Sequence, residues 1–87
     1  MHRLKLSIIA RDTVTYEGEA DAVFVPTTTG IIEVLPNHTQ LVSALKKGEV
    51  VLKSIDGEKK WKVSGGVLEV RPKSQVVILV DLMKAAL

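Results

Sequence analysis

The sequence contains no cysteine, so neither a disulfide nor a thiolate-bound metal can stabilise this protein. Aromatic residues are also scarce, with one tryptophan, one tyrosine and one phenylalanine. No apolar run approaches the roughly 18 residues that a transmembrane helix requires. Residues 1–9 alternate charged and apolar side chains, whereas a signal peptide carries a continuous apolar stretch. We therefore expect neither a membrane-spanning helix nor export.

β-branched residues are abundant instead: the chain has 13 valines, 6 isoleucines and 6 threonines among 87 residues. Their stiff side chains favour strands. A hydrophobic content of 46% with 25% charged residues is typical of a globular domain and excludes a disordered chain. The length predicts a single small domain and the composition an all-β fold, which we expect over residues 1–81, followed by a short C-terminal tail at 82–87.

Short alternating or apolar segments separated by turn residues predict a β-sandwich or barrel. We expect Pro26 to end one strand, because proline lacks the N–H that a sheet needs. The dipeptide Asp56-Gly57 is the strongest hairpin signal and suits a two-residue type I′ turn. Residues 82–87 have helical propensity, although so short a segment makes no stable isolated helix. The expected strands cover residues 3–8, 13–17, 20–25, 31–35, 41–45, 49–55, 60–63, 67–70 and 75–80.

Residues 50–52 and 76–80 are apolar on both faces of their expected strands. A two-sheet sandwich buries only one face of each strand, and the sequence has no long amphipathic helix to cover the other. We therefore expect part of an outer face to bind another protein. The alternative is a central strand whose second face is covered by loops.

The two halves of the chain differ in charge, since residues 1–44 carry −2 and residues 45–87 carry +4. One interpretation is a surface for nucleic acid or for an acidic partner. The other is a solvated sheet edge or hairpin, where lysines discourage edge-to-edge aggregation. We favour the second, because the only aromatic nearby is Trp61, which we expect in the core or in an interface. The lysines concerned are Lys46, Lys47, Lys53, Lys59, Lys60 and Lys62.

The sequence offers little for catalysis or metal binding. Its two histidines, His2 and His38, do not suffice for a zinc site without cysteine. A triad of His38, Ser64 and an aspartate can be imagined, but no Gly-x-Ser-x-Gly elbow supports it. Gly65-Gly66 precedes a strand rather than a helix, which favours a bend where only glycine fits over a phosphate loop. We predict no catalytic residue, no cofactor and no metal.

Several motifs follow one another in a characteristic order along residues 4–81. Residues 16–26 read Y-E-G-E-A-D-A-V-F-V-P, residues 34–38 V-L-P-N-H, residues 44–48 A-L-K-K-G and residues 63–70 V-S-G-G-V-L-E-V. In this order they resemble the epsilon subunit of F-type ATP synthases, called delta in mitochondria, which reads S-G-G-x-L-E-V in the last motif. The chain departs from that family at Ile31, which is usually acidic, and at Asn37, which replaces a glycine but can still adopt a positive φ.

This resemblance implies a ten-stranded β-sandwich in the central stalk, bound to the gamma subunit and to the ring of membrane-embedded c subunits. The chain would couple ring rotation, driven by protons or sodium ions, to ATP synthesis without catalytic nucleotide sites of its own. It would lie peripherally at the cytoplasmic face of the bacterial inner membrane. The resemblance assigns gamma contact to Ala10, His38, Thr39 and Leu41, and c-ring contact to Thr28, Thr29, Gly30, Ile31, Ile32 and Glu33.

In this family a C-terminal pair of helices can extend along gamma and inhibit ATP hydrolysis, and in some members it helps to bind ATP. Such a brake needs a long lever, whereas residues 82–87 would form a helix of only about 9 Å. We therefore expect a subunit that transmits torque, lacks helical autoinhibition and does not bind ATP by the family's route. Any brake on hydrolysis would come from another subunit or from bound nucleotide product.

Two other functions fit an all-β chain of this length. A lipoyl- or biotinyl-type carrier domain needs a modified lysine at a hairpin tip, usually within Met-Lys-Met or Asp-Lys-Ala, and residues 56–60 match neither pattern. A nucleic-acid-binding barrel would show an affinity that falls steeply with salt. The modest net charge of +2 and the single tryptophan disfavour it.

Overall fold

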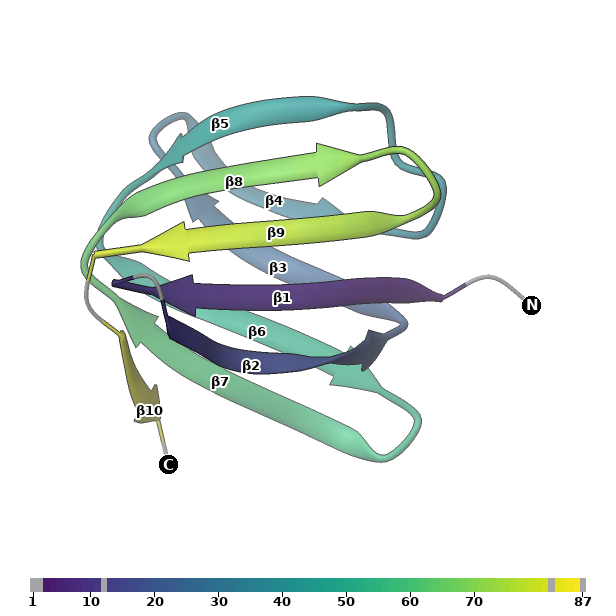
Figure 1. Ribbon diagram of the computed structural model, residues 1–87, viewed down its shortest axis with the longest axis horizontal. Helices are drawn as coiled ribbons and strands as arrows, with labels where there is room; N and C mark the ends of the chain where they lie inside the picture. The colour runs from purple at the N-terminus through teal and green to yellow at the C-terminus, as the bar shows by residue number, and fades with distance from the viewer. Residues whose placement is uncertain (1–2, 12, 82, 87) are drawn as a thin grey trace.

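The computed structural model of the protein describes residues 3–11, 13–81 and 83–86. Within these residues the chain forms ten strands and no helix (Figure 1), and accordingly no helix there could cross a membrane. The strands are β1 (Leu4–Ala10), β2 (Thr13–Ala20), β3 (Ala22–Thr27), β4 (Gly30–Val34), β5 (Leu41–Leu45), β6 (Gly48–Ser54), β7 (Gly57–Val63), β8 (Gly66–Arg71), β9 (Gln75–Val80) and β10 (Met83–Ala86).

The strands follow one another in a single curled sheet, in the order β10-β7-β6-β3-β5-β8-β9-β1-β2, with β4 paired to β3. The sheet folds into two layers (Figure 1): β1, β2, β5, β8 and β9 form one, and β3, β4, β6 and β7 form the other. The layers join where Thr27 of β3 pairs with Leu45 of β5. β1 and β9 run parallel, whereas the other pairs are antiparallel. The predicted ten-stranded β-sandwich is confirmed.

Alternating burial along the strands places one apolar face of each layer in the core. In β1 the buried residues are Leu4, Leu6 and Ile8, as the alternation in the sequence predicts. Trp61 on β7 is 8% exposed, and its ring centroid lies 4.8 Å from that of Tyr16 on β2. This aromatic pair connects the two layers, so the tryptophan occupies the core, one of the two places predicted for it.

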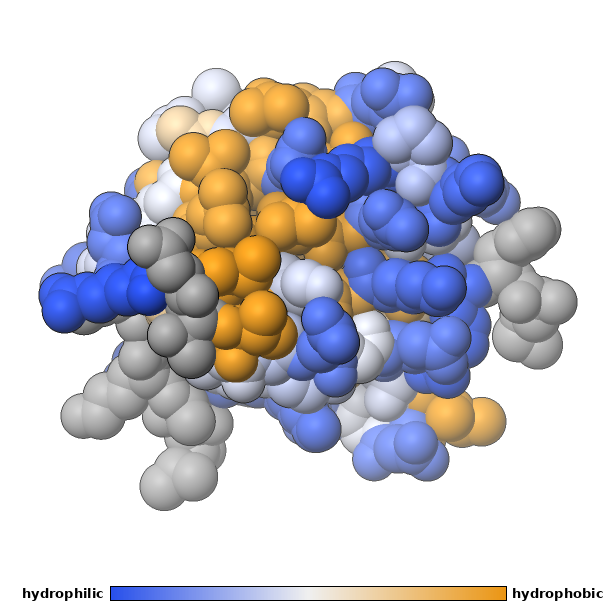
Figure 2. Space-filling view, viewed as in Figure 1, coloured by the Kyte–Doolittle hydropathy of each residue, from blue (hydrophilic) through white to orange (hydrophobic). Residues whose placement is uncertain are grey.

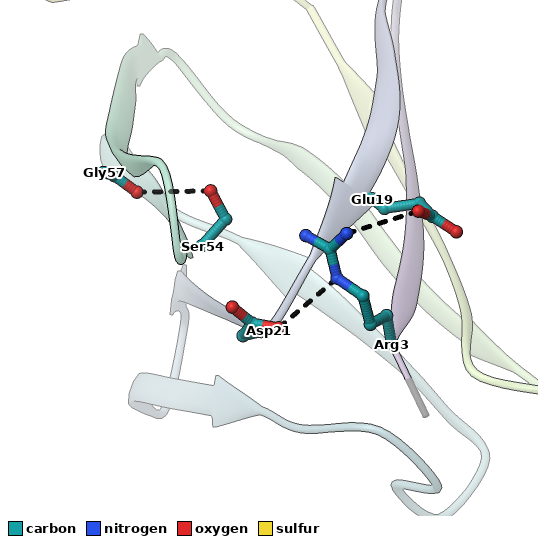
Figure 3. A network of polar contacts seen from close by, with 5 residues as sticks. All are labelled: Arg3, Glu19, Asp21, Ser54 and Gly57. Atoms are coloured by element: carbon teal, nitrogen blue, oxygen red, sulfur yellow. Dashed lines mark hydrogen bonds and ion pairs between the residues drawn. The ribbon is translucent and has the colours of Figure 1, made fainter. Parts of the chain in front are cut away.

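The hairpin predicted at Asp56-Gly57 is present, but its turn lies one residue earlier. Ser54 pairs with Gly57, so Ile55 and Asp56 form the two-residue connection between β6 and β7. The Ser54 hydroxyl donates to the Gly57 carbonyl at 3.5 Å (Figure 3). Gly57 has a φ of 123°, whereas Ile55 and Asp56 do not have positive φ. The type I′ assignment was wrong, because that turn requires positive φ at both central residues and a β-branched isoleucine resists it.

The strand β3 runs further than the sequence indicates. It continues through Pro26 to Thr27, and Pro26 pairs with Ile31 of β4. The carbonyl of Pro26 accepts a hydrogen bond from the Lys46 N–H at 3.0 Å. Pro26 therefore takes part in the sheet through the one hydrogen-bonding group that proline retains, and the expectation that it ends the strand was wrong.

The strand β2 likewise continues through Gly18, where the sequence indicates a break. A Cβ on Gly18 would lie 2.6 Å from the Tyr16 hydroxyl oxygen, so this glycine makes room for the tyrosine ring within the strand. Arg3 lies at the end of β2, where its guanidinium is 3.3 Å from Glu19 and 3.3 Å from Asp21 (Figure 3).

The C-terminal residues form a strand and not the helix that their propensity suggests. β10 pairs antiparallel with β7, with Met83 opposite Val63 and Ala86 opposite Lys60. Without β10, β7 would present unpaired backbone groups along this edge, and one short helical turn would leave them without partners. Pairing with β7 thus overrides local propensity. Leu82 and Leu87, also part of the predicted tail, lie outside the described residues.

Candidate protein-binding surfaces

The hairpin between β3 and β4, which the resemblance assigns to the c-ring, lies at one end of the sandwich (Figure 1). Thr28 and Thr29 form its exposed tip. Thr27 is 1% exposed, and its hydroxyl lies 2.5 Å from the Gly30 carbonyl oxygen and 3.2 Å from the Thr29 hydroxyl. The Thr28 N–H donates to the Ala44 carbonyl at 3.1 Å. A buried threonine and a bond to β5 thus hold the tip in one conformation.

The side chains of β4 alternate between solvent and core. Ile31 is 74% exposed and Glu33 is exposed, whereas Ile32 packs against the core. Gly30 has a φ of 133°, which a side chain rarely allows. Of the residues assigned to the c-ring, Ile31 and Glu33 therefore present side chains to solvent beside the threonine tip.

The loop between β4 and β5 holds His38 and Thr39, which the resemblance assigns to gamma. Asn37 has a φ of 65°, as expected of a residue that replaces glycine, and its N–H donates to the Ser74 hydroxyl at 2.9 Å. The His38 N–H donates to the Leu35 carbonyl at 3.1 Å, and His38 Nδ1 lies 2.7 Å from the Thr39 carbonyl oxygen. These contacts hold the loop against the β8–β9 turn, at the end of the sandwich opposite the β3–β4 hairpin (Figure 1).

The four residues assigned to gamma do not form one cluster. Leu41 lies in the same cross-strand row as Leu6. Ala10 lies four residues further along β1, which corresponds to about 13 Å at the usual rise of a strand. Both Leu41 and Ala10 are partly buried and pack against the core. A single partner that reaches Ala10 and His38 must therefore extend along the length of this layer.

That outer face carries a row of apolar side chains that crosses five strands in register. Val67 is 38% exposed, Leu79 44% and Val14 56%, while Val42, which is 69% exposed, lies beside the row on β5. Figure 2 shows an apolar patch over one end of these strands, with hydrophilic side chains at the other end. We call this set the apolar row; its members are Ala44, Val67, Leu79, Ile9 and Val14.

The sequence indicates this surface only in part. The run at 76–80 predicts an apolar outer face, and Leu79 indeed points outward, with Ile78 and Val80 buried on either side of it. Ile9 and Val14 carry no such signal, because Ile9 directly follows the core residue Ile8 and Val14 stands between two threonines. Only the register, in which Ile9 pairs with both Leu79 and Val14, brings them into one row.

The structure does not bring the imagined triad together. His38 lies just before β5, whereas Ser64 lies near Gly66, which pairs with Leu45 at the far end of β5. The bend at Gly65-Gly66 is confirmed, because a Cβ on Gly66 would collide with the carbonyl oxygen of Leu79. Among the described residues, no group of three or more His, Asp or Glu side chains could hold a metal ion.

Lys53, Lys59, Lys60 and Lys62 lie in the solvated β6–β7 hairpin, one of the settings expected for them, whereas Lys46 and Lys47 lie in the β5–β6 turn. Lys59 and Lys60 belong to β7 itself, away from the Ile55–Asp56 tip where a carrier domain would need its lysine. Lys60 and Lys62 have β6 on one side and β10 on the other, so they do not form a free sheet edge.

Known proteins are similar in sequence to this chain over nearly its whole length. The family profile described as ATP synthase, Delta/Epsilon chain, beta-sandwich domain matches residues 3–86. The ATP synthase epsilon chain of Alkalihalophilus pseudofirmus is 40% identical over 81 residues, which cover 93% of this chain and 60% of that protein. The epsilon chain of Dehalococcoides mccartyi (strain CBDB1) is 40% identical over 86 residues, or 99% of this chain and 61% of that protein. The chain thus spans about three fifths of the length of these relatives.

Solved structures share the fold. A chain in the Euglena gracilis mitochondrial ATP synthase, from a structure of OSCP, F1 and the c-ring, superposes with a TM-score of 0.91 at 21% identity, covering 98% of this chain and 54% of that one. A chain from the central stalk and c-ring of the Tetrahymena thermophila mitochondrial ATP synthase gives a TM-score of 0.75 at 12% identity, covering 93% and 65%. At such identities the likeness concerns the fold alone.

Proposed function

Because the chain belongs to the family of ATP synthase delta and epsilon chains, we propose that it acts in the central stalk, where it binds a gamma-type subunit and a c-ring. In this role it couples ring rotation, driven by protons or sodium ions, to ATP synthesis. The chain contributes structure and coupling, and catalysis belongs to other subunits. As a peripheral part of the synthase, it lies at the cytoplasmic face of the bacterial inner membrane.

The apolar row is the observation that carries this proposal. Single exposed apolar residues are ordinary on a protein surface, but a row that crosses five strands in register is typical of a protein interface. Ala10 follows Ile9 at one end of this face, and Leu41 precedes Val42 at the other. We therefore propose that the gamma-type subunit covers the apolar row and reaches Ala10, His38, Thr39 and Leu41 at its borders.

The β3–β4 hairpin supports contact with the c-ring. Its tip is exposed, yet Thr27 and the packing of Ile32 anchor it to the core. An element that transmits force between two partners needs such an anchor, because a loose loop would yield instead. The residues proposed for c-ring contact remain Thr28, Thr29, Gly30, Ile31, Ile32 and Glu33.

We further propose that residues 83–86 exert no helical brake on ATP hydrolysis. They are paired with β7, and an inhibitory helix would first have to break that pairing. Adding the chain to a catalytic head that contains the gamma-type subunit should leave the rate of ATP hydrolysis unchanged. Strong inhibition that disappears when residues 82–87 are deleted would contradict this.

Binding to the gamma-type subunit of the same organism tests the main proposal. Leu79→Glu places a charge at the centre of the apolar row without entering the core, because Leu79 is 44% exposed. We expect it to weaken co-purification roughly tenfold or more, as the loss of a central interface residue does. Ile55→Glu is the matched control, since Ile55 is 89% exposed on the β6–β7 turn. Equal binding by both variants, with circular dichroism confirming the fold, would refute the assignment.

A further inference from the structure

A hollow lies on the outer face of the other layer, away from the apolar row. Its volume is about 560 Å³, within the usual range for ligand-binding pockets. Phe24 of β3 and Val51 of β6 are register neighbours and form an apolar floor together with Pro26. The hollow is therefore built on the sheet itself.

Close packing at one end gives the hollow its wall. A Cβ on Gly48 would lie 2.9 Å from the Pro26 Cβ, so glycine allows the β5–β6 turn to approach β3. The Lys46 N–H donates to the Pro26 carbonyl at 3.0 Å and holds the turn there. Ile31, which is 74% exposed and pairs with Pro26, adds an apolar rim.

The rim carries uncompensated positive charge. Lys53 Nζ lies 3.7 Å from Glu58 Oε1 and 5.0 Å from the centroid of the Phe24 ring, so its charge already has partners. Glu49 also lies on the rim, so its four lysines and two glutamates leave a net charge of +2. The lysines of the rim that form no ion pair within the described ranges are Lys46, Lys47 and Lys60.

We propose that this hollow binds an acidic segment of a partner protein, which places one apolar side chain on the Phe24–Val51 floor and carboxylates beside the three unpaired lysines. A concave apolar centre with a charged rim is complementary to such a segment. A flat bilayer would not enter the hollow, and the sugar-phosphate backbone of a nucleic acid carries no apolar side chain for the Phe24–Val51 floor. The site lies on the layer opposite the apolar row, so it is independent of binding to a gamma-type subunit, and it shares Ile31 with the proposed c-ring contact.

A short acidic peptide is the probe for this site. We would titrate the isotope-labelled chain with the acetylated amide Glu-Glu-Leu-Glu-Glu and follow backbone NMR shifts. The expected shifts are confined to Phe24, Val51 and the β5–β6 turn, and they shrink as salt screens the lysines. Two control peptides, one with lysine in place of glutamate and one with alanine in place of leucine, should bind severalfold more weakly.

A matched pair of variants locates the site. Lys60→Gln should weaken peptide binding about twofold to fivefold, the usual effect of losing one exposed ion pair. Lys5→Gln, an exposed lysine on the outer face of β1, should leave binding unchanged. Equal weakening by both variants, or no localised shift at millimolar peptide, would overturn the proposal. Stronger binding to phosphatidylglycerol vesicles than to the peptide would overturn it in favour of a lipid. Leu79→Glu should not affect the peptide, so the two proposals can fail separately.

Discussion

Among the glycines, Gly66 is the one at which an added Cβ would approach another atom most closely. Its φ is 144°, and a Cβ there would collide with the backbone carbonyl of Leu79 on β9. Gly57 also has a positive φ, 123°, but no atom lies within 4 Å of the position its Cβ would take. The two glycines therefore separate the cost of backbone strain from the cost of steric collision.

Gly66→Ala should lower the free energy of unfolding by roughly 1–3 kcal/mol more than Gly57→Ala does. Both variants bear the strain of a positive φ, but only the first adds overpacking between β8 and β9. Denaturant unfolding of the two variants measures the difference. Equal losses would mean that β9 shifts freely to accommodate a methyl group.

Trp61→Ala should lower the free energy of unfolding by roughly 3–5 kcal/mol, because it removes a large buried side chain. Trp61 is 8% exposed and packs on Tyr16, so the variant also loses the aromatic contact between the layers. Trp61→Phe keeps an aromatic ring and should lower the free energy of unfolding by less. Because Trp61 is the sole tryptophan, circular dichroism should follow the unfolding. A loss under about 1 kcal/mol, the level of an ordinary substitution, would place the side chain outside the core.

At the scale of elements, the strands are readable from the sequence where turn residues bound an apolar segment. β9 and β5 begin and end at the predicted residues, because turn residues bound both of them. The exact turn of the β6–β7 hairpin was not readable from the sequence, since the pairing of Ser54 with Gly57 depends on how both strands meet the core. β10 could not be predicted from its own residues at all, because its partner edge on β7 is what makes it a strand.

Proline substitutions test whether β10 is hydrogen-bonded to β7. Successive N–H groups of a strand point to opposite edges, so one of Lys84→Pro and Ala85→Pro removes a bond to β7. That variant should raise hydrogen exchange at the amides of residues 60–63, and the other variant should do so much less. Ala85→Ser keeps its N–H and is the control. Unchanged exchange in both proline variants would show that β10 is unpaired in solution.

At the scale of the whole molecule, the sandwich followed from composition and motif order, but the layout of its surfaces did not. Ala10 and His38 were expected at one partner, and the register places them toward opposite ends of one layer. Likewise the apolar row joins residues from five strands, a relation that no single segment contains. Long-range register is set by the packing of the entire core, so sequence motifs alone could not locate either feature.

The orientation of the sandwich in an assembled synthase is the last prediction, and the absence of native cysteine makes it accessible. Thr28→Cys, at the exposed tip of the β3–β4 hairpin, should cross-link to a c subunit through a short reagent. Val42→Cys, 69% exposed beside the apolar row, should cross-link to the gamma-type subunit instead. Ile55→Cys is the control, because β6 separates it by about 20 Å from the Gly48 end that adjoins Pro26. If Ile55→Cys reached the c-ring and Thr28→Cys did not, the sandwich would stand the other way up, and the hairpin at Ile55 would be the element that meets the ring.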